Sequence, residues 1–174
     1  NNRMQSILKI ALPVLLAGTI TTACQTVQTT HGGAVGVQRS QLMMVSAQEV
    51  EQASNQQYQQ MLAEARRKNA LDRDPATVQR VRRIVLRLAA QSGAFRPDAP
   101  SWSWEVHVFS SNELNAWCMA GGKMAIYTGL IERLSLTDDE IAAVMGHEIA
   151  HALREHARER VSKSMATGLG ISVA

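Results

Sequence analysis

The stretch that decides the fold runs from Thr137 to His151 and has the sequence TDDEIAAVMGHEIAH. Thr137 can cap a helix, and Glu140, three residues later, can bond back to the cap, which is the pattern of a capping box. Apolar residues then recur at helical spacing and predict a buried stripe of Ile141, Val144, Met145 and Ile149. We therefore expect a helix that begins at Thr137 and packs on a core.

The same helix carries two histidines four residues apart, His147 and His151, with Glu148 directly after the first. Residues at this spacing lie above one another on a helix face, so both imidazoles can reach one metal ion. A zinc ion with three protein ligands and one open position lowers the pKa of a bound water. Glu148 can take the proton of that water as it attacks a peptide carbonyl. The pattern predicts one catalytic Zn²⁺ per subunit; the alternative is a pair of histidines that make only hydrogen bonds.

The composition is that of a globular protein with one domain. The chain has 174 residues, of which 45% are hydrophobic and 19% charged, enough for a single core. Two cysteines exclude a framework of several disulfides. The net charge of +3 arises from basic and acidic residues scattered along the chain. Such a balance does not favour binding to nucleic acid, and we expect none.

Residues 1–23 have the pattern of a secretory signal peptide. Arg3 and Lys9 precede a short apolar run, residues 10–18. Small residues follow this run, immediately before Cys24. The apolar run is too short to span a bilayer comfortably. Cys24 after a small residue resembles a bacterial lipobox, in which the cysteine is acylated, although Thr21 stands where that motif usually has leucine. Ordinary secretion and a plain N-terminal helix are the alternatives to a lipid anchor.

The hydrophobic pattern and the expected secondary structure change several times along the chain from Cys24 onward. Residues 24–45 have no hydrophobic period and predict a tether, and residues 46–174 predict one domain. Asp74 and Pro75 mark the start of a helix that extends up to Gly93. The remaining expected elements are a polar helix over residues 46–69, strands over 102–110 and 123–128, and a short helix over 130–134.

Three motifs together resemble the HtpX and CAAX prenyl protease family of gluzincin metallopeptidases, and more narrowly its bacterial periplasmic and lipoprotein branch. The motifs are Asn115–Trp117, Gly121–Leu130 and Asp139–His151. The resemblance implies an α+β, zincin-like fold in which the HExxH helix packs on a small sheet. It also implies that His147 and His151 are zinc ligands and that Glu148 is the catalytic glutamate.

The same resemblance implies a substrate-binding edge strand, which holds substrate in extended form through main-chain hydrogen bonds. The residues in that position are Gly122, Lys123, Met124, Ala125, Ile126, Tyr127 and Thr128. The third zinc ligand of the family is a glutamate on a later helix, in a motif that also carries an aspartate. The sequence ends at residue 174 without such a motif, so we expect a domain truncated before its third ligand, with the C-terminal part missing.

Other residues near the end of the active-site helix are weaker candidates. His156 lies five residues after His151, whereas the metzincin pattern requires a third histidine at six, so we expect no ligand there. The charged residues that follow His151 predict a solvated face of ion pairs. These are Arg154, Glu155, Arg158 and Glu159.

We therefore expect an exported zinc metalloendopeptidase that hydrolyses peptide bonds in envelope or misfolded proteins; this substrate class follows from the resemblance alone. Its expected location is the periplasmic side of a bacterial envelope, with a lipid anchor to the membrane at Cys24. One alternative is a non-catalytic envelope chaperone or assembly module with the same fold. Another is a membrane-embedded protease, because residues 165–174 are apolar enough to begin a spanning segment. The pattern indicates nothing about oligomeric state.

Overall fold

The computed structural model describes residues 25–30 and 40–170 of the chain. Two short strands come first, β1 (Gln25–Val27) and β2 (Gln41–Met43). Two long helices follow, α1 (Ala47–Arg67) and α2 (Pro75–Gln91). The remaining elements are the 3-10 turns η2 (Ser92–Ala94) and η3 (Ala99–Ser101), the strands β3 (Glu105–Phe109), β4 (Ala116–Met119) and β5 (Lys123–Tyr127), and the helices α3 (Thr128–Arg133), α4 (Asp138–Leu153) and α5 (His156–Gly168).

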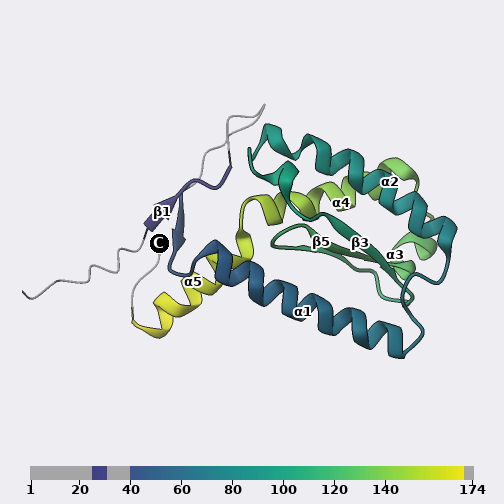
Figure 1. The fold of residues 1–174 in the computed structure, drawn as a ribbon, viewed down its shortest axis with the longest axis horizontal. Helices are drawn as coiled ribbons and strands as arrows, with labels where there is room; N and C mark the ends of the chain where they lie inside the picture. The colour runs from purple at the N-terminus through teal and green to yellow at the C-terminus, as the bar shows by residue number, and fades with distance from the viewer. Residues whose placement is uncertain (1–24, 31–39, 171–174) are drawn as a thin grey trace, which may run out of the picture.

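The central sheet has three strands in the order β3-β5-β4. Strand β5 is parallel to β3, with Met124 opposite Val106, and antiparallel to β4, with Ala125 opposite Trp117. Helix α1 covers one face of the sheet, and α2 and α4 cover the other (Figure 1). This arrangement confirms the predicted α+β class, with the HExxH helix packed on a small sheet.

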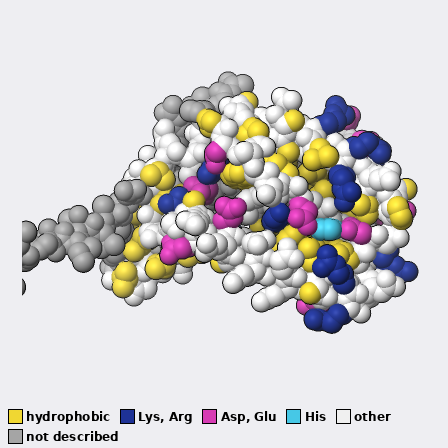
Figure 2. Space-filling view, in the orientation of Figure 1, with side chains coloured by type: hydrophobic (Ala, Val, Ile, Leu, Met, Phe, Trp, Pro, Cys, Tyr) yellow, Lys and Arg dark blue, Asp and Glu magenta, His cyan; other side chains and the backbone are white. Residues whose placement is uncertain are grey.

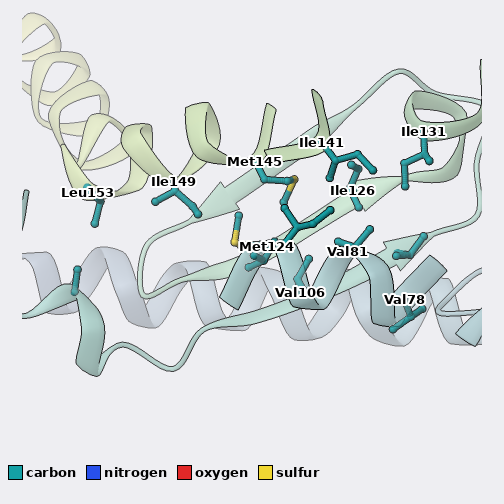
Figure 3. Packing of buried hydrophobic residues seen from close by; sticks show 14 residues of the cluster. Val78, Val81, Val106, Met124, Ile126, Ile131, Ile141, Met145, Ile149 and Leu153 are labelled. Atoms are coloured by element: carbon teal, nitrogen blue, oxygen red, sulfur yellow. The ribbon is translucent and has the colours of Figure 1, made fainter. Parts of the chain in front are cut away.

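The main core lies between α2, the sheet and α4 (Figure 3). From α4, Ile141, Met145 and Ile149 are buried in this core, as the stripe predicts, whereas Val144 is only half-buried. Each fully buried side chain of this kind contributes about 1.5–3 kcal/mol to the free energy of folding. Their partners include Val78, Val81 and Val85 of α2, Val106 and Val108 of β3, and Met124 and Ile126 of β5.

A second, smaller core joins α1 to the opposite face of the sheet. Tyr58 and Leu62 of α1 are buried against Phe109 and Ala125. Trp117 of β4 packs edge-on against Tyr58, with ring centroids 5.9 Å apart. Most other residues of α1 are exposed and polar, so the apolar stripe of this helix is narrow.

A network of polar side chains ties α1 to the sheet at the border of the second core. The Tyr58 hydroxyl donates to Glu105 (3.2 Å), and Lys123 donates to the other oxygen of the same carboxylate (3.1 Å). The two ring nitrogens of His107 contact Glu105 and Asp72. Figure 2 shows a row of basic, acidic and histidine side chains across this face of the molecule. Burial and the nearby Glu105 carboxylate raise the pKa of Tyr58, so its hydroxyl stays a donor.

Local capping contacts fix the starts of the long helices. In α4, the Glu140 amide donates to the Thr137 hydroxyl (3.3 Å), and the Thr137 amide donates to the Glu140 carboxylate (2.8 Å). These bonds confirm the predicted capping box. The bonds from the Thr137 amide and hydroxyl to the Glu140 carboxylate lower the pKa of Glu140. The same box joins Ser46 and Glu49 at the start of α1. Asp74 caps α2 with Pro75 at its first position, as expected.

The N-terminal strands differ from the tether predicted over residues 24–45. Strands β1 and β2 pair with each other, and β2 docks on α5. The buried Gln41 amide donates to the Arg154 carbonyl (2.7 Å) and to the Glu159 carboxylate (2.9 Å). The Met44 amide donates to the buried Ser162 hydroxyl (2.8 Å). A polar sequence without a hydrophobic period therefore forms ordered structure here because its partners lie on a distant helix.

The predicted signal peptide and Cys24 lie outside the described residues. The last four residues of the segment 165–174, which was considered as the start of a membrane span, also lie outside them. Within residues 25–30 and 40–170, no helix combines the length and the apolar character needed to cross a bilayer.

Two helical glycines, Gly129 and Gly146, differ in the space available for a side chain. Gly129 is the second residue of α3, and a Cβ atom there would lie 2.6 Å from the carbonyl oxygens of Asn112 and Glu113. Those atoms belong to the backbone of a neighbouring loop, to which the Gly129 amide is bonded through the Ser111 carbonyl (2.7 Å). Gly146 lies inside α4, and a Cβ atom there would meet nothing within 4 Å.

The two glycines should therefore respond in opposite directions to alanine. We expect Gly129→Ala to lower the free energy of unfolding by about 1–3 kcal/mol, because backbone must move to make room. We expect Gly146→Ala to raise it by about 0.5–1 kcal/mol, because alanine favours the helix and meets open space. Urea unfolding followed by circular dichroism measures both changes. Equal stability of the parent and Gly129→Ala would contradict the close packing at the start of α3.

Candidate metal centre

Helix α4 places His147, Glu148 and His151 outside the core that its apolar stripe fills. Both histidines are exposed, and Glu148 is half-buried. The Nε2 atoms of His147 and His151 lie 2.9 Å apart, and the two rings are nearly perpendicular, at 89°. The two predicted histidines thus lie one turn apart on one helix, and their Nε2 atoms converge.

The two converging nitrogens suit neighbouring ligands of one metal ion. Two nitrogens that each lie about 2.0–2.1 Å from a tetrahedral zinc are about 3.3 Å apart, close to the separation seen here. Imidazole is also among the donors that zinc prefers. Within the described part of the chain, no group of three His, Cys, Asp or Glu side chains surrounds a common metal position. His147 and His151 are therefore the two candidate ligands of such a site among the described residues.

His156 contacts His151 from the other side. Its Nδ1 atom lies 2.6 Å from Nδ1 of His151, so it meets the nitrogen that does not face His147. The ring centroids of the two residues are 4.8 Å apart. His156 is thus a neighbour of His151, a contact that the sequence spacing alone did not identify.

The charged residues after His151 do not form the solvated face that the sequence predicts. Glu159 is only 5% exposed and bonds to Gln41 of β2. The Glu155 side chain is 11% exposed and lies between Arg96 (3.5 Å) and Arg158 (3.1 Å). The prediction was wrong because β2 and the segment around Arg96 cover this part of the chain.

A cleft of about 340 Å³ lies beside the histidine pair. Its walls come from β4, the first turn of α1, the end of α4 and the start of α5. Its lining includes Val50, Trp117, Cys118, Glu148, His151 and Arg160. Glu148 and one member of the histidine pair therefore border a space that is large enough to admit a segment of another chain.

The strand beside this cleft is not the one that the family resemblance implies. Residues 122–128 were expected to form the edge strand, yet β5 lies in the centre of the sheet. Its main-chain groups pair with β3 on one side and with β4 on the other. The expectation came from the family resemblance alone. In the structure, Gly121 and Gly122 lie in the turn from β4 to β5, with φ of +81° and +84°. They mark a hairpin and carry no information about which strand is outermost.

The strand edge that lines the cleft belongs to β4. Among the residues that the structure describes, this strand pairs only with β5. The Tyr127 amide donates to the Asn115 carbonyl (3.0 Å), and the Gly122 amide donates to the Met119 carbonyl (3.2 Å). Because pairing alternates along an antiparallel strand, the main-chain groups of Cys118 point away from β5. These groups are therefore placed to pair with another extended segment.

Cys118 lies between this edge and the catalytic candidate. Burial raises the pKa of its thiol, and the negative charge of Glu148 raises it further. The thiol thus stays protonated and uncharged at neutral pH, and it donates weakly to the Met119 carbonyl (3.6 Å). It contributes a small neutral side chain to the wall of the cleft.

The sequence did contain a signal for β4 that was not used. Large apolar residues at Trp117 and Met119 alternate with small ones at Ala116 and Cys118, directly before a glycine pair and a second strand. Two strand-like runs that are joined by a short glycine-containing loop predict a hairpin. The first turn of α1, in contrast, forms another wall of the cleft and lies about 70 residues before β4 in the sequence. No local sequence pattern predicts that these two segments meet.

Comparison with known proteins gives a family. The profile of peptidase family M48 matches residues 75–174. The mitochondrial metalloendopeptidase OMA1 of Bos taurus is 30% identical over 125 residues, which are 71% of this chain and 23% of that protein. The metalloprotease LoiP of Escherichia coli is 26% identical over 163 residues, which are 94% of this chain and 58% of that protein. The mitochondrial metalloendopeptidase OMA1 of Arabidopsis thaliana is 40% identical over 63 residues, or 36% of this chain and 13% of that protein.

This chain spans between 13% and 58% of the length of these relatives. The family match begins at the first residue of α2 and includes the central sheet, the histidine pair and α5. It confirms the resemblance to a gluzincin metallopeptidase at the level of the family. Because the matched residues make up more than half of the chain, the chain belongs to peptidase family M48.

Proposed function

We propose that the protein is a zinc-dependent metalloendopeptidase. The observation that carries this proposal is the convergence of His147 and His151 beside Glu148, at a cleft bordered by a free strand edge. Membership of peptidase family M48 supports it, as do relatives that are named metalloendopeptidases and metalloproteases.

Each member of the motif has a role in this proposal. His147 and His151 hold the ion through their Nε2 atoms, which α4 already aims at one point. Zinc, when bound, polarises a peptide carbonyl and lowers the pKa of water toward neutrality. Glu148 accepts a proton from the attacking water and delivers it to the leaving amine. Its half-buried position on the cleft wall gives it access to both atoms.

The substrate is proposed to be a polypeptide in extended form. The outward main-chain groups of β4 offer it a row of donors and acceptors, as in strand addition. Trp117 and Val50 add apolar surface to the same cleft. A segment must be unfolded to pair in this way, which favours misfolded proteins, including those of a bacterial envelope, as substrates.

We further propose that the protein belongs to the bacterial periplasmic and lipoprotein branch of the family. The support is the sequence of residues 1–24, in which an export signal is followed by Cys24. The acyl group on Cys24 would anchor the domain to a membrane, and residues 25–174 would lie on the periplasmic side.

Removal of the Glu148 carboxylate tests the peptidase proposal. We expect Glu148→Gln to lower the rate of cleavage of zinc-loaded protein on unfolded, casein-like substrate by about 100-fold or more, because the proton acceptor is lost. The amide keeps the size of the side chain, so stability should not change. Glu132→Gln, at an exposed position of α3, is the control and should cleave like the parent. Equal cleavage by Glu148→Gln and the parent would reject the proposal in favour of a non-catalytic envelope module.

Replacement of Cys24 tests the anchor separately. We expect Cys24→Ser to move the protein from the membrane fraction to the soluble periplasmic fraction, because serine cannot carry the thioether-linked lipid. Cell fractionation and immunoblotting measure the distribution. Cys118→Ser is the matched control, since that cysteine lies in the wall of the cleft, and it should remain in the membrane fraction. Membrane retention of Cys24→Ser would exclude an acyl anchor at this position.

A further inference from the structure

The connection between α4 and α5 is a tight turn with one unusual residue. Glu155 has φ of 52° and ψ of 38°, the left-handed conformation that residues with a side chain seldom adopt. Such a conformation is strained and persists only where the surroundings fix it. It bends the chain directly after the HExxH helix, and the next residue, His156, contacts His151.

Several contacts hold this turn in place. The Glu155 carboxylate lies between Arg96 and Arg158, at 3.5 and 3.1 Å. The Arg158 guanidinium also donates to the Val45 carbonyl (2.6 Å), just after β2. Gln41 of β2 donates to the carbonyl of Arg154, the residue before the turn (2.7 Å). The turn is therefore fixed by segments from three different parts of the chain.

From this geometry we propose that His156 is a positioning residue for the metal ligand His151, an inference that rests on the proposed function. Nδ1 of His156 lies 2.6 Å from Nδ1 of His151, on the opposite edge of the ring from the Nε2 atom that faces His147. His151 thus has one nitrogen for the metal and one for a protein partner. The partner fixes both the rotation of the ring and the nitrogen that carries its proton.

The direction of this hydrogen bond follows from the chemistry of the ligand. A metal-binding nitrogen must be unprotonated, so the proton of a neutral His151 lies on Nδ1 when Nε2 binds the metal. The Nδ1–H group of His151 then donates to Nδ1 of His156, whose own proton lies on Nε2. A hydrogen bond of this kind at the second nitrogen orients a ligand histidine and raises its basicity.

Two variants of His156 separate the hydrogen bond from the bulk of the ring. In His156→Leu the side chain fills space but accepts no hydrogen bond. In His156→Asn the amide oxygen can reach the position of Nδ1 and accept from His151. Arg160→Gln is the control, because Arg160 lies on the same helix as His156 and lines the same cleft. Circular dichroism and the thermal midpoint of unfolding establish that every variant is folded.

The first measurement needs no metal. Nitrogen-15 NMR of the imidazoles at pH 8 reports the proton position of His151, which is assigned through His151→Gln. We expect the Nδ1–H form of His151 to dominate in the parent, in His156→Asn and in Arg160→Gln. We expect His156→Leu to shift His151 toward the Nε2–H form, because the acceptor at Nδ1 is gone.

The second measurement is the affinity of the chain for Zn²⁺, from competition with a chromophoric chelator. We expect His156→Leu to bind Zn²⁺ about 10- to 100-fold more weakly than the parent, as is typical when the partner of a ligand is removed. His156→Asn should recover most of the affinity, and Arg160→Gln should match the parent.

The outcomes distinguish this inference from the proposed function. Failure of the parent to bind Zn²⁺ would reject the zinc peptidase, while the NMR measurement would still decide whether His156 orients His151. An unchanged proton position in folded His156→Leu would overturn the inference, and so would an unchanged Zn²⁺ affinity in a parent that binds zinc. Equal losses of affinity in His156→Leu and His156→Asn would overturn it too. They would mean that the hydrogen bond from His151 does not contribute to Zn²⁺ binding.

Discussion

The structure depends on one constraint, which is the periodicity of α4. Ile141, Met145 and Ile149 recur at a spacing that places them on a single face, and the sheet and α2 bury that face. Once this face is fixed, the rotation of the helix is fixed as well. His147 and His151 must then point away from the core and toward each other. The apolar stripe therefore orients the candidate ligands without contacting them.

Features that are encoded locally could be predicted from the sequence. The capping box of Thr137 and Glu140 and the Asp74–Pro75 start of α2 involve residues within one helical turn, and each appears as expected. The HExxH pair depends only on the rise and twist of a helix, so its convergence also follows from spacing alone. Packing against the core then needs only the correct face, which the period of the apolar residues supplies.

Features that depend on distant partners could not be predicted in the same way. The position of β5 in the centre of the sheet requires both the hairpin with β4 and the parallel pairing with β3. The sequence of β5 alone does not indicate how many strands pair with it, or along which of its edges they pair. Likewise, Glu159 has the sequence context of an exposed charge and is buried because Gln41, far away in sequence, bonds to it. The turn at Glu155 is likewise held in part by Arg96, which lies far from it in the sequence.

The docking of β2 on α5 also has a consequence for the order of folding. The bond from Gln41 to Glu159 joins residues that are 118 positions apart, whereas the capping contacts join residues three apart. Closing a long loop costs more chain entropy than closing a short one, so contacts of this kind tend to form late. During synthesis, Gln41 must wait until α5 has left the ribosome. The turn beside His151 then gains its last support only after α5 has been made.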